Sequence, residues 1–108
     1  MAYDEGLATR IRERLEEVPH VEKKMFGGVA FMVNGHMTVG VVKSEMMVRL
    51  DKAQHDDMMD QPHTRIMDFT KRPMRGWAYV DEAGVAKDEV LDYWIDRCVS
   101  HWMAQPPK

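Results

Sequence analysis

The sequence predicts an α+β domain in which an antiparallel sheet of about five strands is flanked by an N-terminal and a C-terminal helix. Three observations lead to this fold class. Apolar residues recur at helical spacing near both ends of the chain, and the region between them contains short apolar runs separated by turn residues. One of the turns is Asn34-Gly35, a pair that type I′ hairpins favour because both central residues need a positive φ.

The first helix is expected over about residues 3–17, because apolar residues recur there every three or four positions and charged residues fill the other sides. Pro19 ends the pattern. The apolar positions are Leu7, Ile11, Leu15 and Val18.

Two strands are expected on either side of Asn34-Gly35, over residues 29–33 and 36–42. If the ladder has no bulge, Phe31 pairs with Thr38, Val29 pairs with Gly40, and Val39 and Val41 share a face with Ala30. Both faces are then apolar, whereas a sheet face in water alternates to polar residues. We therefore expect helices of the same chain to cover one face and a second subunit to cover the other. The candidate interaction face consists of Val29, Phe31 and Val33 with the later basic residues Lys71, Arg72 and Arg75.

The later elements follow from local patterns. Apolar runs predict strands at residues 46–50, 64–69 and 77–80, and Asp51 is expected to cap a helical turn in the polar segment up to Gln61. Residues 70–76 form a basic connection and residues 81–86 a loop. A wide apolar stripe predicts the final helix from Asp88 to about Met103, and its members are Val90, Leu91, Trp94, Ile95, Cys98, Val99 and Trp102. One domain is expected over residues 1–108, with an ordered core at about 3–103.

Composition and charge exclude several classes of function. The chain has 108 residues, of which 44% are apolar and 31% charged, and its formal charge of −3 disfavours nucleic-acid binding through charge alone. The single cysteine excludes an internal disulfide and a multi-thiolate zinc site. No apolar run approaches the ~20 residues that span a bilayer, and the acidic, amphipathic N-terminus does not resemble a secretion signal. We therefore expect a cytoplasmic protein without membrane association.

Few residues are candidates for catalysis or ligand binding. Gly27-Gly28 lacks the Lys-Ser or Lys-Thr of a phosphate-binding loop, so a bulge or a close backbone contact is the favoured interpretation. The acidic segment around His55 and His63 matches no standard metal-binding spacing. Cys98 lies on the apolar stripe of the final helix and is expected to be a small core residue. No catalytic residue, cofactor or metal is therefore expected.

One basic cluster stands out, formed by Lys71, Arg72 and Arg75 and followed closely by Trp77. Basic groups interleaved with aromatic ones can bind nucleic acid or an acidic partner. The acidic residues that follow and the negative overall charge favour solvated loop charge instead.

Two blocks of residues at matching distance resemble the N-terminal domain of the TfoX/Sxy family. The first is an MFGG run with the Asn-Gly hairpin, and the second is a PMRGW run that leads into a strand and a helix. The motif residues, all interpreted as structural, are Met25, Phe26, Gly27, Gly28, Asn34, Gly35, Pro73, Met74, Gly76 and Trp77. The resemblance implies a small α+β fold related to secretion-chaperone-like domains, often dimeric, with no catalytic residues to carry over.

The family is named for bacterial competence regulators, in which this domain precedes a second, helical domain. The present chain stops at Lys108 without one, so we expect a stand-alone member. The leading hypothesis is a non-enzymatic, cytoplasmic homodimer that acts, in a regulatory role or otherwise, through contacts with a protein partner of unknown identity. Two alternatives stay open. One is a small apolar-ligand module lined by Met and Trp side chains, and the other is a nucleic-acid-associated regulator of transcription or competence.

Overall fold

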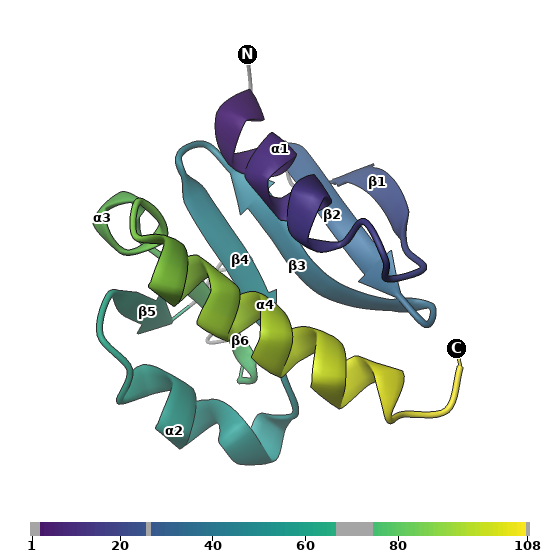
Figure 1. Ribbon diagram of the computed structural model, residues 1–108. Coiled ribbons are helices and arrows are strands. Elements are labelled where there is room, and N and C mark those ends of the chain that lie inside the picture. Colours follow the sequence, from purple (N-terminus) through teal and green to yellow (C-terminus); the bar gives the residue numbers. More distant parts are fainter. Residues whose placement is uncertain (1–2, 26, 67–74, 108) are drawn as a thin grey trace.

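A six-stranded antiparallel sheet with helices on one face forms the framework of the protein (Figure 1). The computed structural model describes residues 3–25, 27–66 and 75–107, and within these ranges the strand order is β1-β2-β3-β4-β6-β5. The strands are β1 (Val21–Met25), β2 (Gly28–Val33), β3 (His36–Val42), β4 (Glu45–Arg49), β5 (Thr64–Ile66) and β6 (Trp77–Val80). The helices are α1 (Glu5–Arg14), the 3₁₀ helix η1 (Lys52–Gln54), α2 (His55–Met59), α3 (Glu82–Val85) and α4 (Asp88–Met103). The predicted α+β class with terminal helices is thereby confirmed.

Helix α1 buries its apolar side as the sequence predicts and begins at Glu5, two residues after the predicted start. Asp4 is its N-cap, and the carboxylate accepts a hydrogen bond from the backbone N–H of Leu7 at 3.1 Å. The buried residues are Leu7, Ala8 and Ile11. The helix ends at Arg14, three residues before the predicted boundary, and Leu15 is its C-cap.

Strand β1 was not predicted and explains why the sheet has one strand more than expected. Its sequence, VEKKM, shows little apolar alternation, but it pairs with β2 along its whole length, from Val21 opposite Met32 to Met25 opposite Gly28. Gly27 therefore lies in the turn between two strands and has a φ of 75°. The strand depends on its neighbour in the sheet, which a local pattern does not reveal.

A register shift between Phe31 and Met32 changes which side chains share a face of the β2–β3 hairpin. Val33 pairs with His36 as predicted, but Phe31 pairs with Val39 instead of Thr38, and Val29 pairs with Val41 instead of Gly40. The extra residue of this bulge is Thr38. The bulge therefore moves Val39 and Val41 onto the face that carries Val29 and Phe31, and the predicted register is wrong beyond the first two pairs.

The main hydrophobic core lies between this face and the helices. Val29, Phe31, Val39 and Val41 belong to the same buried cluster as Ile11 of α1 and as Leu91, Trp94 and Cys98 of α4. Figure 1 shows α1 and α4 crossing the same side of the sheet. Val29, Phe31 and Val33 are exposed by no more than 2% each. The prediction that these three form an interaction face is therefore wrong, because the chain's own helices and strands enclose them.

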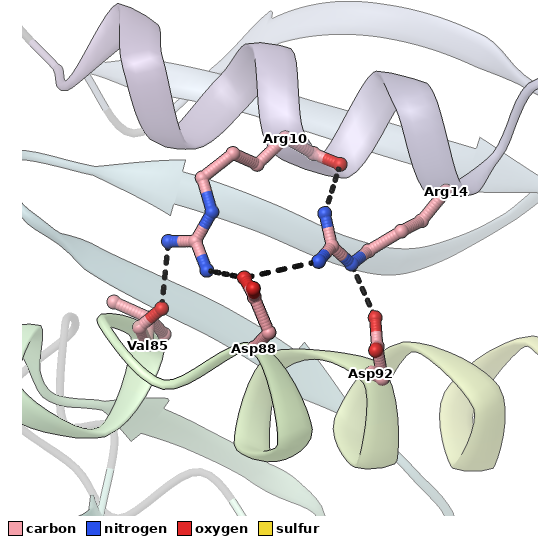
Figure 2. Close-up of polar contacts among 5 residues, drawn as sticks. All are labelled: Arg10, Arg14, Val85, Asp88 and Asp92. Atoms are coloured by element: carbon pink, nitrogen blue, oxygen red, sulfur yellow. Dashed lines mark hydrogen bonds and ion pairs between the residues drawn. The ribbon is translucent and has the colours of Figure 1, made fainter.

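An ion-pair cluster connects the two long helices at the surface of this core (Figure 2). Arg10 donates to the carboxylate of Asp88 and to the backbone carbonyl of Val85, both at 2.7 Å. Arg14 contacts Asp88 at 3.2 Å and also pairs with Asp92. The Arg10 hydrogen bond holds the pKa of Asp88 below its usual value. The cluster orients α1 against the start of α4.

The shorter elements occupy the β5–β6 end of the sheet. Asp51 caps η1 as predicted, accepting from the backbone N–H of Ala53 at 3.0 Å. Residues 64–66 of the predicted strand at 64–69 form β5, and the rest lies outside the described residues. The predicted loop at residues 81–86 contains the short helix α3, which Asp81 caps through the N–H of Gly84.

Candidate functional site

The sheet face opposite the helices carries a second apolar cluster, which we call the second sheet face. Ala30, Met37 and Met47 are buried in it, each exposed by no more than 4%. Met32, Val42, Trp77 and Tyr79 are partly buried around them. All seven residues lie on strands, whereas the described helices contribute to the cluster on the other face.

Gly40 leaves room on this face for the side chain of Met47. A Cβ at Gly40 would lie 2.7 Å from the terminal methyl of Met47, so the Met47 side chain lies directly over the β3 backbone. At the β5–β6 end, Arg65 lies over the ring of Tyr79 at 4.6 Å and donates to Glu45 at 2.7 Å. The second sheet face is therefore an apolar strip with an ion pair at its margin.

One corner of the second sheet face is hollowed and exposed. Val21 of β1, opposite Met32, is 58% exposed. A pocket of about 370 Å³ adjoins these residues and is lined also by Pro19, His20 and Lys23. An exposed apolar side chain beside a pocket is a common feature of surfaces that bind a partner.

The Asn34-Gly35 pair has a structural role beyond the turn. Both residues have positive φ, 57° and 82°, as the predicted hairpin requires. The side-chain amide of Asn34 also donates to the carbonyls of Trp102 and Gln105, at 3.2 Å and 2.6 Å. The hairpin tip therefore satisfies carbonyl groups at the C-terminal end of α4.

Gly28 and Gly76 mark close backbone approaches, whereas a Cβ at Gly27 would meet no atom within 4 Å. A Cβ at Gly28 would overlap the carbonyl of Val41, which agrees with the close contact predicted for this doublet. Gly76 has a φ of 89°, and a Cβ there would lie 2.6 Å from the carbonyl oxygen of Leu50. Phe26, Pro73 and Met74, and also the side chain of Met25, lie outside what the structure describes.

The predicted basic cluster is represented by one residue, because Lys71 and Arg72 lie outside the described residues. Arg75 is exposed and lies 3.5 Å from the carboxylate of Asp56. It shares a pocket with Trp77 and with Arg49 of β4. Sequence reasoning missed Arg49, which is separated from Arg75 by 26 positions in the chain and lies inside a strand-like run. An arginine within an apolar strand was the available signal.

The histidines near the acidic segment make separate contacts. His55 is 5% exposed, and its Nδ1 accepts a hydrogen bond from the N–H of Gly76 at 3.2 Å. His63 lies 3.1 Å from Asp81, the cap of α3. Within residues 3–25, 27–66 and 75–107, no group of three or more His, Cys, Asp or Glu side chains is arranged to hold a metal ion.

Cys98 is buried in the main core, and this burial raises the pKa of its thiol to about 12. A protonated, enclosed thiol is a poor nucleophile. The interpretation of Cys98 as a small core residue therefore agrees with its surroundings.

The main core lies between the sheet and the helices, and the pockets given by the described residues are open to the surface. One, of about 200 Å³, is lined by residues of α4 that include Tyr93 and Trp94 and by Gln61 and Pro62. None of the helices in the described part of the chain is both long enough and apolar enough to cross a membrane.

Comparison with known families gives one match. The model of the TfoX N-terminal domain matches residues 13–102, which covers most of the chain. Among curated proteins and among solved structures, nothing matches the chain significantly.

Proposed function

The chain belongs to the TfoX N-terminal domain family, and from this premise we propose that it acts by binding another protein chain, a second copy of itself, and not by catalysis. The observation that carries the proposal is the second sheet face. Antiparallel sheets that face water on one side alternate to polar residues there. This face instead carries the partly exposed Met32 and Val42 of the central hairpin around the buried Ala30 and Met37.

The exposed corner at β1 is the part most suited to an interface. Val21 and Met32 offer apolar surface beside a pocket of about 370 Å³, large enough to accept a side chain of a partner. Methionine side chains are flexible and adapt to a facing surface. Trp77 and Tyr79, at the other end of the face, have further interactions within the chain, so the proposed contact centres on Met32.

A second copy is the partner that the surface chemistry favours. A two-fold dimer brings the same patch of both subunits together, so the patch must not carry charges of one sign only. Lys23 borders the pocket at one corner, and Glu45 lies at the opposite margin of the face.

The absence of enzymatic activity is part of the same proposal. Gly28 and Gly76 allow close backbone approaches, Asn34 donates to backbone carbonyls, His55 accepts from a backbone N–H, and the Cys98 thiol is enclosed and protonated. These observations support a binding domain. A cytoplasmic location fits a chain with a single, reduced cysteine.

The mass of the protein in solution tests the dimer. We expect sedimentation equilibrium to give twice the 12.6 kDa of one chain. Met32→Glu is expected to produce folded monomers, because a carboxylate in an apolar contact loses its hydration without gaining a partner. Met103→Glu is the matched control, since Met103 is 50% exposed on α4 and the same substitution there should leave the dimer intact.

Two results would count against the proposal. A mass of one chain at concentrations of about 100 μM removes the homodimer, since stable dimers with a standard-size interface associate more tightly than this. A dimer that survives Met32→Glu removes this surface as the interface.

A further inference from the structure

A pocket at the end of β4 gathers positive charge on a chain that is acidic overall. Its volume is about 220 Å³, and it is lined by Arg49, Lys52, Arg75, Trp77, Trp102 and Asp51. Three of these side chains are cationic and one is acidic, whereas the whole chain carries a formal charge of −3. The pocket therefore carries net positive charge on a protein whose overall charge is negative.

The Arg49 side chain lies close to two tryptophan rings. Its guanidinium carbon is 4.6 Å from the ring centre of Trp102 and 5.2 Å from that of Trp77. The indole N–H of Trp102 donates to the Arg49 carbonyl at 2.8 Å, and the His36 ring stacks on Trp102 at 4.6 Å. The two rings contact the guanidinium through cation–π interactions, which use none of its N–H donors in hydrogen bonds to the rings.

Among the described residues, Arg49 differs from the other arginines in having no acidic partner. Of the arginines that the structure describes, each of the others pairs with a carboxylate, and the partners are Asp88, Glu22, Asp92, Glu45, Asp56 and Asp57. Arg49 forms no such pair, even though Asp51 lies two residues away. The Asp51 carboxylate instead accepts from the N–H of Ala53 as the cap of η1.

Partial burial without a counter-ion is unfavourable for Arg49. Desolvation lowers the pKa of its guanidinium, because burial disfavours the charged form. No described side-chain nitrogen or oxygen is both fully buried and without a hydrogen-bond partner. Since the Arg49 guanidinium has no described acceptor, its nitrogen atoms are accessible to solvent. An anion entering the pocket would therefore restore the missing charge pairing.

Lys52 strengthens the case for an anion. Lys52 borders the same pocket and is exposed, and its ammonium group forms no ion pair with a described carboxylate. Arg75 lies 3.5 Å from the exposed carboxylate of Asp56. Guanidinium and ammonium groups that line one pocket suit an oxyanion, because they donate charge-assisted hydrogen bonds to carboxylate and phosphate oxygens.

We propose that the pocket formed by Arg49, Lys52 and Arg75 between Trp77 and Trp102 binds a small oxyanion group, a phosphate or a carboxylate, carried by a small molecule. The volume of about 220 Å³ admits an anionic head group and lies below the ~300–1,000 Å³ that encloses a whole drug-sized ligand. This site is separate from the Met32 corner, so it does not depend on the proposed dimer.

The indole N–H signals of Trp77 and Trp102 provide a direct readout by two-dimensional NMR. We would titrate the protein with sodium phosphate, glycerol 2-phosphate and sodium acetate at constant ionic strength, with sodium chloride as the reference. Saturable shifts of the Trp102 signal are expected with at least one of the oxyanions. A response to the phosphates alone assigns a phosphate site, and a response to acetate as well assigns a general oxyanion site.

Substitutions inside and outside the pocket test whether the anion binds there. Arg49→Met keeps an unbranched apolar stem against the tryptophans and is expected to weaken binding about tenfold or more, as expected for loss of charge-assisted hydrogen bonds. Lys52→Gln, at an exposed position, is expected to weaken it less and serves if Arg49→Met does not fold. Arg65→Met is the matched control, because Arg65 also lies over an aromatic ring but outside this pocket.

The proposal is overturned if none of the oxyanions shifts the Trp102 signal beyond the chloride reference. It is equally overturned if the shifts persist unchanged in folded Arg49→Met and in Lys52→Gln.

Discussion

The contact between the hairpin tip and the end of α4 makes Asn34 the residue whose replacement is most informative. Its amide donates two hydrogen bonds, to the carbonyls of Trp102 and Gln105, and its backbone has a φ of 57°. Asn34→Gly removes the two bonds and keeps the turn, because glycine adopts positive φ freely. At ~0.5–1.5 kcal/mol for each bond, the loss in free energy of unfolding is about 1–3 kcal/mol.

A second replacement separates the side-chain bonds from the backbone conformation. Asn34→Ala loses the same bonds and adds about 1 kcal/mol for a Cβ residue in the left-handed region. In thermal unfolding followed by circular dichroism, about 1–3 kcal/mol corresponds to a fall in Tm of about 5–20 °C for Asn34→Gly, and Asn34→Ala should melt lower still. If both variants melt within about 2 °C of the original protein, Asn34 does not support α4, and the reasoning is refuted.

Three further predictions concern the core and its surface. Phe31→Asp is expected to unfold the chain and not merely to release a partner, because the ring is fully buried; a folded variant by circular dichroism would contradict this. Arg10 holds the pKa of Asp88 below its ordinary value, so this pair stabilises the fold above the unfolded pKa of about 4, and the contribution is lost as the pH falls further. Denaturant titrations across pH should show that the free energy of unfolding falls less steeply at acid pH in Arg10→Met than in the original protein. An identical pH profile in the two proteins would exclude the coupling. Cys98, with its pKa raised to about 12, is expected to react with a thiol reagent at about pH 8 only after unfolding, so rapid labelling of the native protein would disprove its enclosure.

Elements with a strong local pattern were predictable from the sequence. Helix α4 has the predicted bounds of Asp88 and Met103, and its apolar stripe forms part of the main core. The Asn34-Gly35 turn and the Asp51 cap also occur where expected. In each case the determining interactions are a few residues apart, so periodicity or a single turn preference contains the information.

The candidate interaction face was predicted with the wrong residues because register is a property of two strands. One additional residue at Thr38 shifts the ladder, and with a side-chain period of two it transfers Val39 and Val41 to the other face. Val29 and Phe31 consequently lie under the helices, while Met32 and Met37 lie on the second sheet face. An apolar hairpin was predictable, but the face that remains for a partner was not.

The sequence by itself determined the α+β class, the terminal helices, the hairpin and the family, because these depend on local periodicity and on short motifs. The tertiary structure alone decided that VEKKM forms a strand, and it alone brought Arg49 beside Trp77 and Trp102. The physical reason is that strand pairing, and the charge that a side chain meets, depend on residues far apart in the chain. Only their packing shows that Arg49, alone among the described arginines, pairs with no described carboxylate.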